Sequence, residues 1–322
     1  MRRAVVSWLL VGVLFVAAFI AGVAALNADL YSPRGFVRGY LDALGRRDAA
    51  TALAIAGIPA PDSADGDQAA RLLTPAALVG FDDIRPIADV RETDGTHTVT
   101  FDVTLDNGTA RAVFHVEPDG SRFGVFEKWR FAEEPLAQLS VSVEGARAAT
   151  VNGEPVTTDG EEPFLVLVPG LYIVDHGSTW LEADDVPTRV TEPGDVVEAT
   201  IEARANREFT TTVQTDVNAA LDRCATQELL QPSGCPFGYE LTDRAESTPD
   251  WSITRFPAVT ITPGAKPGEW EATARKGTAH LEVEVRSLFD GAESTLEEDV
   301  RFTAEYAILI DDTGQFTLSA VD

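Results

Sequence analysis

Lysine is scarce in this 322-residue chain, and basic residues are few overall. Lysine and arginine together number 25, against 52 aspartates and glutamates, so the formal net charge is −27. The three lysines, Lys128, Lys266 and Lys276, lie far apart in the sequence and form no basic cluster. Because such a chain repels phosphate backbones, nucleic acid is excluded as an expected partner. The acidity itself is interpreted as a solubilising coat, since no acidic run has the spacing of a calcium loop.

Histidine and cysteine are also rare, which restricts the chemistry that the chain could perform. There are four histidines and two cysteines, and the sequence contains no HExxH, GxSxG or phosphate-binding loop motif. Zinc normally takes four ligands, and no histidine lies near the cysteines. The sequence therefore predicts no metal, no cofactor and no enzymatic activity.

Long hydrophobic runs are absent after the first 26 residues, but Ala4 to Leu26 is one uninterrupted uncharged run of 23 residues. As a helix it would measure about 34 Å, compared with about 30 Å of bilayer hydrocarbon. This length favours a permanent anchor, because the apolar core of a cleaved signal usually has about 7 to 15 residues. Cleavage remains the alternative, since the small residues Val23, Ala24 and Ala25 would suit a signal peptidase.

The charges that flank this run predict its orientation. Arg2 and Arg3 should remain in the cytoplasm, although Arg34 and Arg38 follow on the other side. We therefore expect a single-pass protein of the cell membrane with a cytoplasmic N-terminus and an extracellular body. In that compartment the pair Cys224 and Cys235 predicts one disulfide, and a two-cysteine metal site is the less favoured alternative.

Beyond the anchor, the first folded segment begins with helical patterns. Ser32 and Pro33 open a helix with one apolar face that ends at Gly45, and Asp48 can cap a second helix through Ala56. The sequence AARLLTPAAL, residues 69–78, resembles a third helical piece that Pro75 interrupts.

Strand patterns follow the helices. Alternating apolar residues in 97–105 and the dipeptide Asn107-Gly108 predict a hairpin. With those two residues as the turn, the expected cross-strand pairs are Leu105 with Ala110, Val103 with Ala112, Phe101 with Phe114 and Val99 with Val116. The sequence EPDGS, 117–121, predicts the next turn, after which Phe123, Val125, Trp129 and Phe131 would share a face.

The sequences FVRGYLDALGRRDAATALAIAG and FEKWRFAEEPL, with the hairpin between them, resemble the nuclear-transport-factor-like, or cystatin-like, cone-shaped fold. This fold occurs in uncharacterised actinobacterial membrane-anchored envelope proteins, and the resemblance covers about a third of the chain. The segment containing VNG and VPGLYIV is similar to the middle part of such proteins. The resemblance implies helices packed on one face of an antiparallel sheet, without implying a catalytic residue.

The remaining sequence predicts two further domains. Strand patterns and the turn dipeptides Asn152-Gly153 and Pro169-Gly170 favour a small all-β, sandwich-like domain over 136–205. A helix with Val217, Leu221 and Cys224 on one stripe, followed by four strands, favours a C-terminal α+β domain with an antiparallel sheet over 206–322. The predicted strands lie in the segments 257–264, 277–288, 299–310 and 314–321. The expected organisation is thus α+β, with an anchor over 1–27 and a cone-like domain over 28–135.

Enzymes with a cone-like fold place a carboxylate inside the cone, so inward-facing polar residues are the candidate site. Inward positions here are apolar apart from His97, which indicates a filled cone. Tyr40 and His97 could frame the polar end of a cavity. Glu127 is expected on the same strand face as Trp129. A core role for Tyr40 is the simpler interpretation.

The function expected from these observations is a non-catalytic module of the cell envelope. It would bind envelope proteins or cell-wall material, or hold a spacing, with the membrane as a partner of its N-terminal helix. The alternative is a small-ligand sensor or an enzyme that uses the cavity of the cone-like domain.

Overall fold

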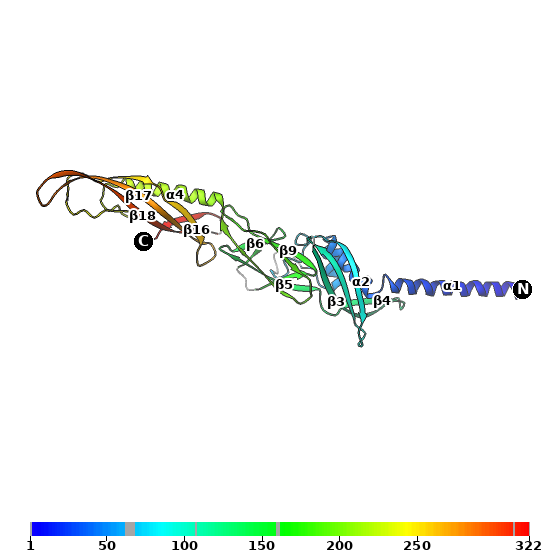
Figure 1. Cartoon of the computed structure of the whole chain (residues 1–322). Helices are drawn as coiled ribbons and strands as arrows, with labels where there is room; N and C mark the ends of the chain where they lie inside the picture. Colours follow the sequence, from blue (N-terminus) through cyan, green and yellow to red (C-terminus); the bar gives the residue numbers. More distant parts are fainter. Residues whose placement is uncertain (1, 62–67, 107, 159–161, 312, 322) are drawn as a thin grey trace. The chain divides into compact units, whose positions relative to one another are not determined.

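The computed structural model of the chain describes residues 2–61, 68–106, 108–158, 162–311 and 313–321 (Figure 1). Strands account for 46% of the chain and helices for 20%, and most of the strand pairs are antiparallel, so the β-rich α+β class is confirmed. The strands 136–144 and 196–202 run parallel, since Gln138 N bonds to Asp195 O and Ala203 N bonds to Glu144 O. The chain divides into two compact units. Unit 1 consists of 1–142, 148–175 and 185–200, and unit 2 consists of 143–147, 176–184 and 201–322.

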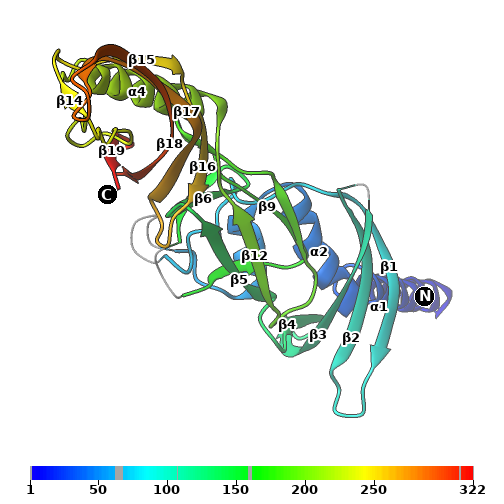
Figure 2. The same ribbon diagram turned by 60° about the vertical axis from the view of Figure 1, so that its left-hand side comes forward.

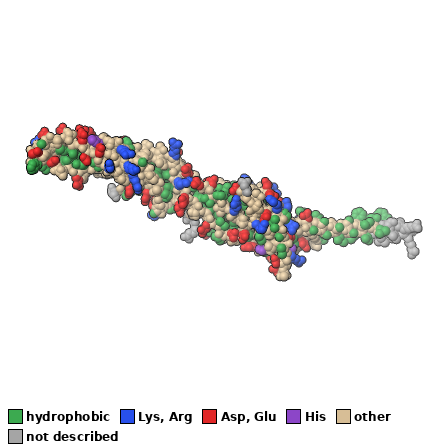
Figure 3. Space-filling view, in the orientation of Figure 1, with side chains coloured by type: hydrophobic (Ala, Val, Ile, Leu, Met, Phe, Trp, Pro, Cys, Tyr) green, Lys and Arg blue, Asp and Glu red, His purple; other side chains and the backbone are tan. Residues whose placement is uncertain are grey.

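Unit 1 begins with α1 (Arg2–Ala28), the helix of the hydrophobic run. Its window Leu10–Ala28 is long and apolar enough to cross a membrane, and none of that window is buried. Figure 3 shows hydrophobic side chains along the described part of this helix, whereas charged side chains appear over the rest of the visible surface.

Helices α2 (Pro33–Gly45) and α3 (Ala49–Ala56) follow as predicted, and local hydrogen bonds explain their ends. The Ser32 hydroxyl accepts from the amide of Gly35 at 3.0 Å, and the Asp48 carboxylate accepts from the amide of Thr51 at 3.0 Å. Side-chain acceptors of this kind satisfy amides that have no partner within the first helical turn. Gly57, with φ of 75°, ends α3 in the left-handed conformation that glycine adopts most readily.

The predicted third helical piece is wrong. Residues 68–78 form turns, and Pro75 cannot donate the backbone hydrogen bond that a continuing helix would need.

The helices contact a four-stranded sheet with the order β1-β2-β3-β4. Its strands are β1 (Asp82–Arg91), β2 (His97–Leu105), β3 (Gly108–Arg122) and β4 (Phe126–Phe131). The inward residues Phe101, Phe114 and Tyr40 are fully buried, and the Tyr40 ring packs edge-on against Phe114 at 5.9 Å. The expected apolar filling of this face is therefore observed.

The predicted register of the β2–β3 hairpin is wrong by two residues. Leu105 pairs with Gly108 and Phe101 with Ala112, because Asp106, with φ of 46°, already begins the turn. Asn107 lies outside the described residues. The same residues remain buried, since a two-residue shift preserves the side of the sheet on which each side chain lies.

The predicted turn at 117–121 is also wrong. Strand β3 continues to Arg122 with an irregularity between Pro118 and Ser121, and the chain turns at Phe123 and Gly124, which have φ of 56° and 71°. The expected apolar face therefore begins too early, because Phe123 and Val125 belong to this exposed turn.

Two more sheets complete unit 1, with the orders β11-β9-β6-β7 and β12-β5-β8. Their strands are β5 (Leu136–Glu144), β6 (Ala148–Val151), β7 (Glu154–Thr157), β8 (Phe164–Leu167), β9 (Gly170–Asp175), β11 (Val186–Val190) and β12 (Val196–Glu202). Both predicted turn dipeptides connect strands here. The Asn152 side chain donates to Ala77 O at 2.6 Å and to Leu171 O at 2.9 Å, so this turn contacts the loop before β1 as well as β9.

Unit 2 contains α4 (Arg207–Ala225) and a six-stranded sheet with the order β14-β17-β18-β19, in which β15 and β16 also pair with β17 (Figure 2). The strands are β14 (Arg244–Ala245), β15 (Asp250–Arg255), β16 (Ala258–Pro263), β17 (Glu269–Arg286), β18 (Glu293–Ile310) and β19 (Phe316–Ala320). A short pair, β10 (Leu181–Glu182) with β13 (Arg204–Ala205), precedes α4. All four predicted strands exist, but β17 and β18 are longer than expected, since an irregularity between Ala274 and Gly277 lets β17 continue past the glycine.

Two buried tyrosines of unit 1 predict how its stability depends on pH. Burial raises the pKa of Tyr40 and Tyr172 above the ordinary value of 10.0. Both therefore stay protonated in the folded unit above pH 10, where the unfolded chain ionises. Their contribution to stability is complete below about pH 10 and falls by about 1.4 kcal/mol per tyrosine for each pH unit above it, until the folded pKa is reached.

The variant Tyr172→Phe tests this expectation in the full chain, unfolded by denaturant at several pH values in detergent. Between pH 6 and 9 it should lose about 1 kcal/mol, the contribution of one hydrogen bond, at every pH. Above pH 10 its stability should fall less steeply than that of the parent. Equal slopes for the parent and the variant would contradict the prediction.

Candidate functional site

Tyr40 is the first of the three predicted cavity residues, and the structure places it in the core. Its side chain has no exposed surface, and its hydroxyl donates to Val168 O at 2.8 Å and lies 3.3 Å from Pro135 O. Both carbonyls lie at or beyond the expected domain boundary at 135, within unit 1. Tyr40 thus connects α2 to the start of β5 and the end of β8, and its hydroxyl is occupied by these carbonyls.

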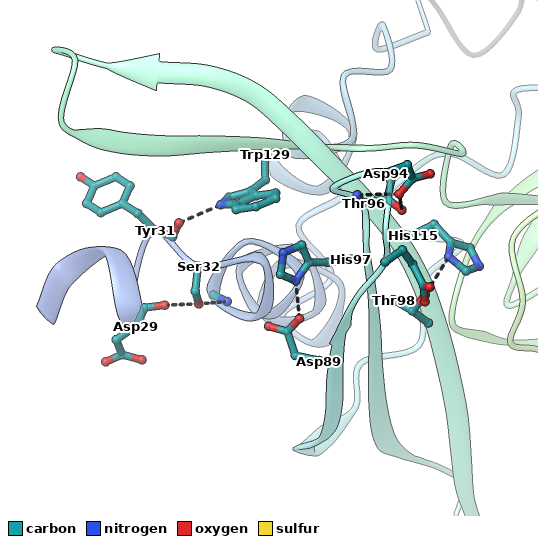
Figure 4. Close-up of polar contacts among 12 residues, drawn as sticks. Asp29, Tyr31, Ser32, Asp89, Asp94, Thr96, His97, Thr98, His115 and Trp129 are labelled. Atoms are coloured by element: carbon teal, nitrogen blue, oxygen red, sulfur yellow. Dashed lines mark hydrogen bonds and ion pairs between the residues drawn. The ribbon is translucent and has the colours of Figure 1, made fainter. Parts of the chain in front are cut away.

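His97 lies at one end of the β1–β4 sheet, close to the end of α1. Its Nδ1 is 2.7 Å from the Asp89 carboxylate on β1, and its ring packs edge-on against Trp129 with centroids 5.1 Å apart (Figure 4). The indole of Trp129 donates to Tyr31 O at 2.8 Å. His97 and Asp89 are each less than one-fifth exposed. The structure therefore brings His97 together with Asp89 and Trp129, while Tyr40 makes its bonds to carbonyls elsewhere.

Glu127 is exposed at the start of β4, and its backbone amide donates to the Asn27 side chain at 3.3 Å. Tyr40, His97 and Glu127 therefore do not converge on one pocket. The sequence pattern suggested otherwise for Glu127 because Phe123 and Val125 were expected to continue the buried face of β4.

A groove of about 880 Å³ lies within unit 2, between α4, the loop that contains the disulfide, and strands β18 and β19. Leu221 and Cys224 contribute from α4, Ala304 and Tyr306 from β18, and Leu318 from β19. The other lining residues are Asp216, Ala219, Ala220, Arg223, Gly234, Cys235, Pro236, Thr303, Glu305, Phe316, Ala320 and Val321.

The position of α4 explains why the groove is open. Asn206 caps the helix by accepting from the amide of Phe209 at 2.9 Å. The buried stripe of α4 consists of Phe209, Val213, Val217, Leu221 and Cys224. The helix contacts β15 and β16, on one side of β17. The half of the sheet formed by β18 and β19 is therefore left partly uncovered, and small residues such as Ala220 on that side of the helix do not fill the space.

The predicted disulfide is confirmed, and both of its cysteines line this groove. Cys224, in the last turn of α4, is bonded to Cys235 across 11 positions, with Cα atoms 5.8 Å apart. Inside the loop, the Gln227 side chain donates to Ser233 O at 3.2 Å and accepts from the amide of Ser233 at 2.9 Å. These contacts hold Gly234 and Pro236 at the edge of the groove.

The groove combines buried apolar residues at its floor with charged residues at its rim. Tyr306 lies on the floor with 7% of its surface exposed, and burial raises its pKa above 10.0. Asp216, Arg223 and Glu305 supply the charges. The lining contains no histidine, and its two sulfur atoms are joined to each other, so it offers neither an imidazole base nor a free thiolate. Among the described residues, no group of three His, Cys, Asp or Glu side chains could hold a metal ion.

Sequence reasoning missed this groove, although each of its elements was expected. The alternation of Phe302, Ala304, Tyr306, Ile308 and Ile310 is typical of a strand with one buried face, and the structure buries the first four of these residues and leaves Ile310 partly exposed. One weak signal in the sequence could have suggested the groove. The apolar stripe of α4 is short, and more apolar strand residues are available than this stripe can cover. The lateral position of the helix on the sheet depends on tertiary packing.

Comparisons with known proteins add no assignment: no family model, curated protein or solved structure matches the chain.

Replacement of both cysteines by alanine is expected to destabilise unit 2 by about 3 kcal/mol, because the unfolded chain gains the freedom that the closed loop denies it. Denaturant unfolding of the full chain, followed by tryptophan fluorescence, measures this loss. Trp251 is a suitable reporter, since its indole donates to Leu229 O at 2.8 Å inside the disulfide loop. Reductant should destabilise the parent similarly and leave the double variant unchanged. If the parent and the double variant unfold at the same denaturant concentration, the prediction is wrong.

Proposed function

We propose that this chain is a single-pass membrane protein with its N-terminus in the cytoplasm, and that its folded units act outside the cell membrane as a non-catalytic module of the cell envelope. The module binds envelope proteins or cell-wall material, or acts as a spacer within the envelope. The proposal combines a membrane anchor, a disulfide-bonded body and a groove whose lining has no histidine and no free thiol.

The single observation that carries this proposal is the exposure of α1. Large apolar side chains along the helix, such as Trp8, Leu14 and Phe15, are each at least 67% exposed. An exposed apolar helix of this length is strongly unfavourable in water and suits the hydrocarbon of a bilayer. The core helix of a soluble protein would instead be covered by its own fold.

Two further observations support the placement of the folded units on the outer side. The disulfide between Cys224 and Cys235 suits an oxidising compartment, because cytosolic thiols are normally kept reduced. Arg2 and Arg3 precede the apolar run, which favours a cytoplasmic N-terminus.

We also propose that residues 28–135 form a cone-like domain of the nuclear-transport-factor-like type. Support comes from α2 and α3, which contact a four-stranded antiparallel sheet. The alternative function, a sensor or enzyme that uses the cone cavity, is less well supported. Tyr40, Phe101 and Phe114 fill the inward face, and Glu127 lies outside it.

The groove of unit 2 is the surface that we propose for binding, with a segment of another envelope protein that carries both polar and apolar side chains as its occupant. The floor residues Ala304 and Tyr306 are buried beneath walls that contain Phe316 and Leu318. The partly exposed side chains of Phe316 and Leu318 offer apolar surface for a partner to cover, and the rim charges can orient the segment.

Topology is tested with single added cysteines, because both native cysteines are bonded to each other. In intact cells, a membrane-impermeant maleimide should label Thr109→Cys. A cysteine added before Arg2 should react only after the membrane is permeabilised. The opposite labelling pattern, or loss of the N-terminal cysteine by cleavage of the segment, would contradict a retained anchor with an outer body.

Binding in the groove is tested with a photoreactive amino acid at Leu318 in intact cells. The matched control is Thr317, its exposed neighbour on β19, whose side chain points to the other face of the sheet. Leu318 should cross-link to a specific protein and Thr317 should not. The substitution Ala220→Trp, which occupies the groove, should reduce the cross-link severalfold. Equal cross-linking at both positions would exclude the groove as the binding surface.

A further inference from the structure

The turn between β3 and β4 exposes apolar side chains in an unusual backbone conformation. Phe123 is 83% exposed and has φ of 56°, and Val125 is 39% exposed. A bulky residue rarely adopts positive φ, and an exposed phenylalanine contributes nothing to the core. The positive φ of Phe123 is energetically unfavourable, and the folded chain nevertheless keeps this aromatic ring outside its own core.

This turn is attached to the end of α1. The Asn27 side chain donates to Val125 O at 2.7 Å and accepts from the amide of Glu127 at 3.3 Å. The rings of Tyr31 and Phe126 stack with centroids 4.6 Å apart. Figure 4 shows the hairpin that carries Trp129 running beside the last turn of the helix, where Trp129 donates to Tyr31 O.

The bonds between Asn27 and the β3–β4 turn determine the depth of the turn relative to the bilayer. Asn27 is the first polar residue after the apolar run, so it marks the boundary between hydrocarbon and headgroups. Tyr31 and Trp129 lie next to it, and aromatic residues of this kind concentrate at membrane interfaces. Val125 is hydrogen-bonded to Asn27 and thus lies at the same level as this boundary.

The charges around the turn fit the same location. The Arg122 guanidinium lies 5.5 Å from the centre of the Phe123 ring, where it can contact lipid phosphates while the ring enters the apolar layer. The nearby carboxylate of Asp119 is paired with Lys128 at 2.9 Å. Asp29 and Glu127 are exposed carboxylates in the same region, so attraction to anionic lipid does not explain the contact.

We infer that the β3–β4 turn is a second membrane contact, in which Phe123 and Val125 insert into the leaflet on the folded side and hold the β1–β4 sheet against the bilayer. The inference rests on the proposed membrane span of α1 and extends it. A single helix leaves the attached domain free to tilt, whereas a second contact beside the helix restricts that motion.

The test uses the full chain in phosphatidylcholine liposomes, with an environment-sensitive fluorophore on one added cysteine at a time. Phe123→Cys probes the turn. Thr109→Cys is the matched control, because it is an exposed position near the opposite end of the same strand, about 40 Å away at 3.3 Å per residue. Val13→Cys, within α1, reports whether the helix spans the bilayer. Lipids with nitroxide groups on their acyl chains quench fluorophores that enter the hydrocarbon.

We expect strong quenching at positions 13 and 123 and none at position 109. A label at Val125→Cys should also be quenched, and Phe123→Asp in the same chain should abolish most of that quenching. Quenching at 13 with none at 123 would overturn the second contact and leave the anchor intact. Absence of quenching at 13 would overturn the proposed span itself. A label at 123 that is shielded from water but insensitive to nitroxide lipids would point to a protein partner and would also contradict the inference.

Discussion

The exposed apolar surface of α1 is the constraint on which the interpretation of this protein depends. Water cannot accommodate a helix of bilayer length whose large side chains lie uncovered, and no residue of its apolar window is buried by the rest of the chain. A bilayer resolves this conflict. Once the helix lies in a membrane, Asn27 marks the interface and the compartment of the remaining chain becomes a question of orientation, which the disulfide and the terminal arginines help to answer.

In unit 1, a few polar groups determine how its sheets are connected. Buried polar atoms need partners, and Tyr40 meets that need with the carbonyls of Val168 and Pro135. Asn152 does the same with Ala77 and Leu171. These bonds extend from the α2 helix and the loop before β1 to strands of the later sheets, so residues far apart in sequence belong to one compact unit. The Tyr40 hydroxyl, which the sequence offered as a possible cavity group, thus joins segments of the core.

Unit 2 illustrates how a groove can arise when a helix covers only part of a sheet. The sheet of β17 and β18 is long, and one helix of 19 residues cannot cover it entirely. Because α4 contacts the β15 and β16 side, the β18 and β19 side has an apolar floor that is open to a partner. The disulfide joins the last turn of α4 to the following loop, and both of its cysteines line this groove.

Much of the local structure followed from the sequence, because its causes are local. The hydrophobic run, the Ser32 and Asp48 caps, the Gly45 and Gly57 ends, the Asn152-Gly153 turn and the cysteine pair all depend on residues that are near in sequence or few in number. Two predictions failed because the turns form at other residues than expected. The β2–β3 turn begins at Asp106, before the expected Asn107-Gly108, and the next turn lies at Phe123 and Gly124, after the expected 117–121. The alternation of apolar residues shows which side of each strand is buried. A shift of the pairing by two residues leaves this alternation unchanged, so the alternation could not determine the register.

The sequence by itself therefore determined the apolar N-terminal helix, the β-rich α+β class, the capped helices and the pairing of the only two cysteines. The tertiary structure alone decided that Tyr40 closes a core, that Glu127 faces solvent, that a groove lies beside α4, and that the turn at Phe123 is fastened to Asn27. The physical reason is that caps, spans and turns are governed by neighbouring residues. Packing between segments that are distant in the chain decides which carbonyl accepts from a buried hydroxyl. It also decides how far a helix extends over a sheet.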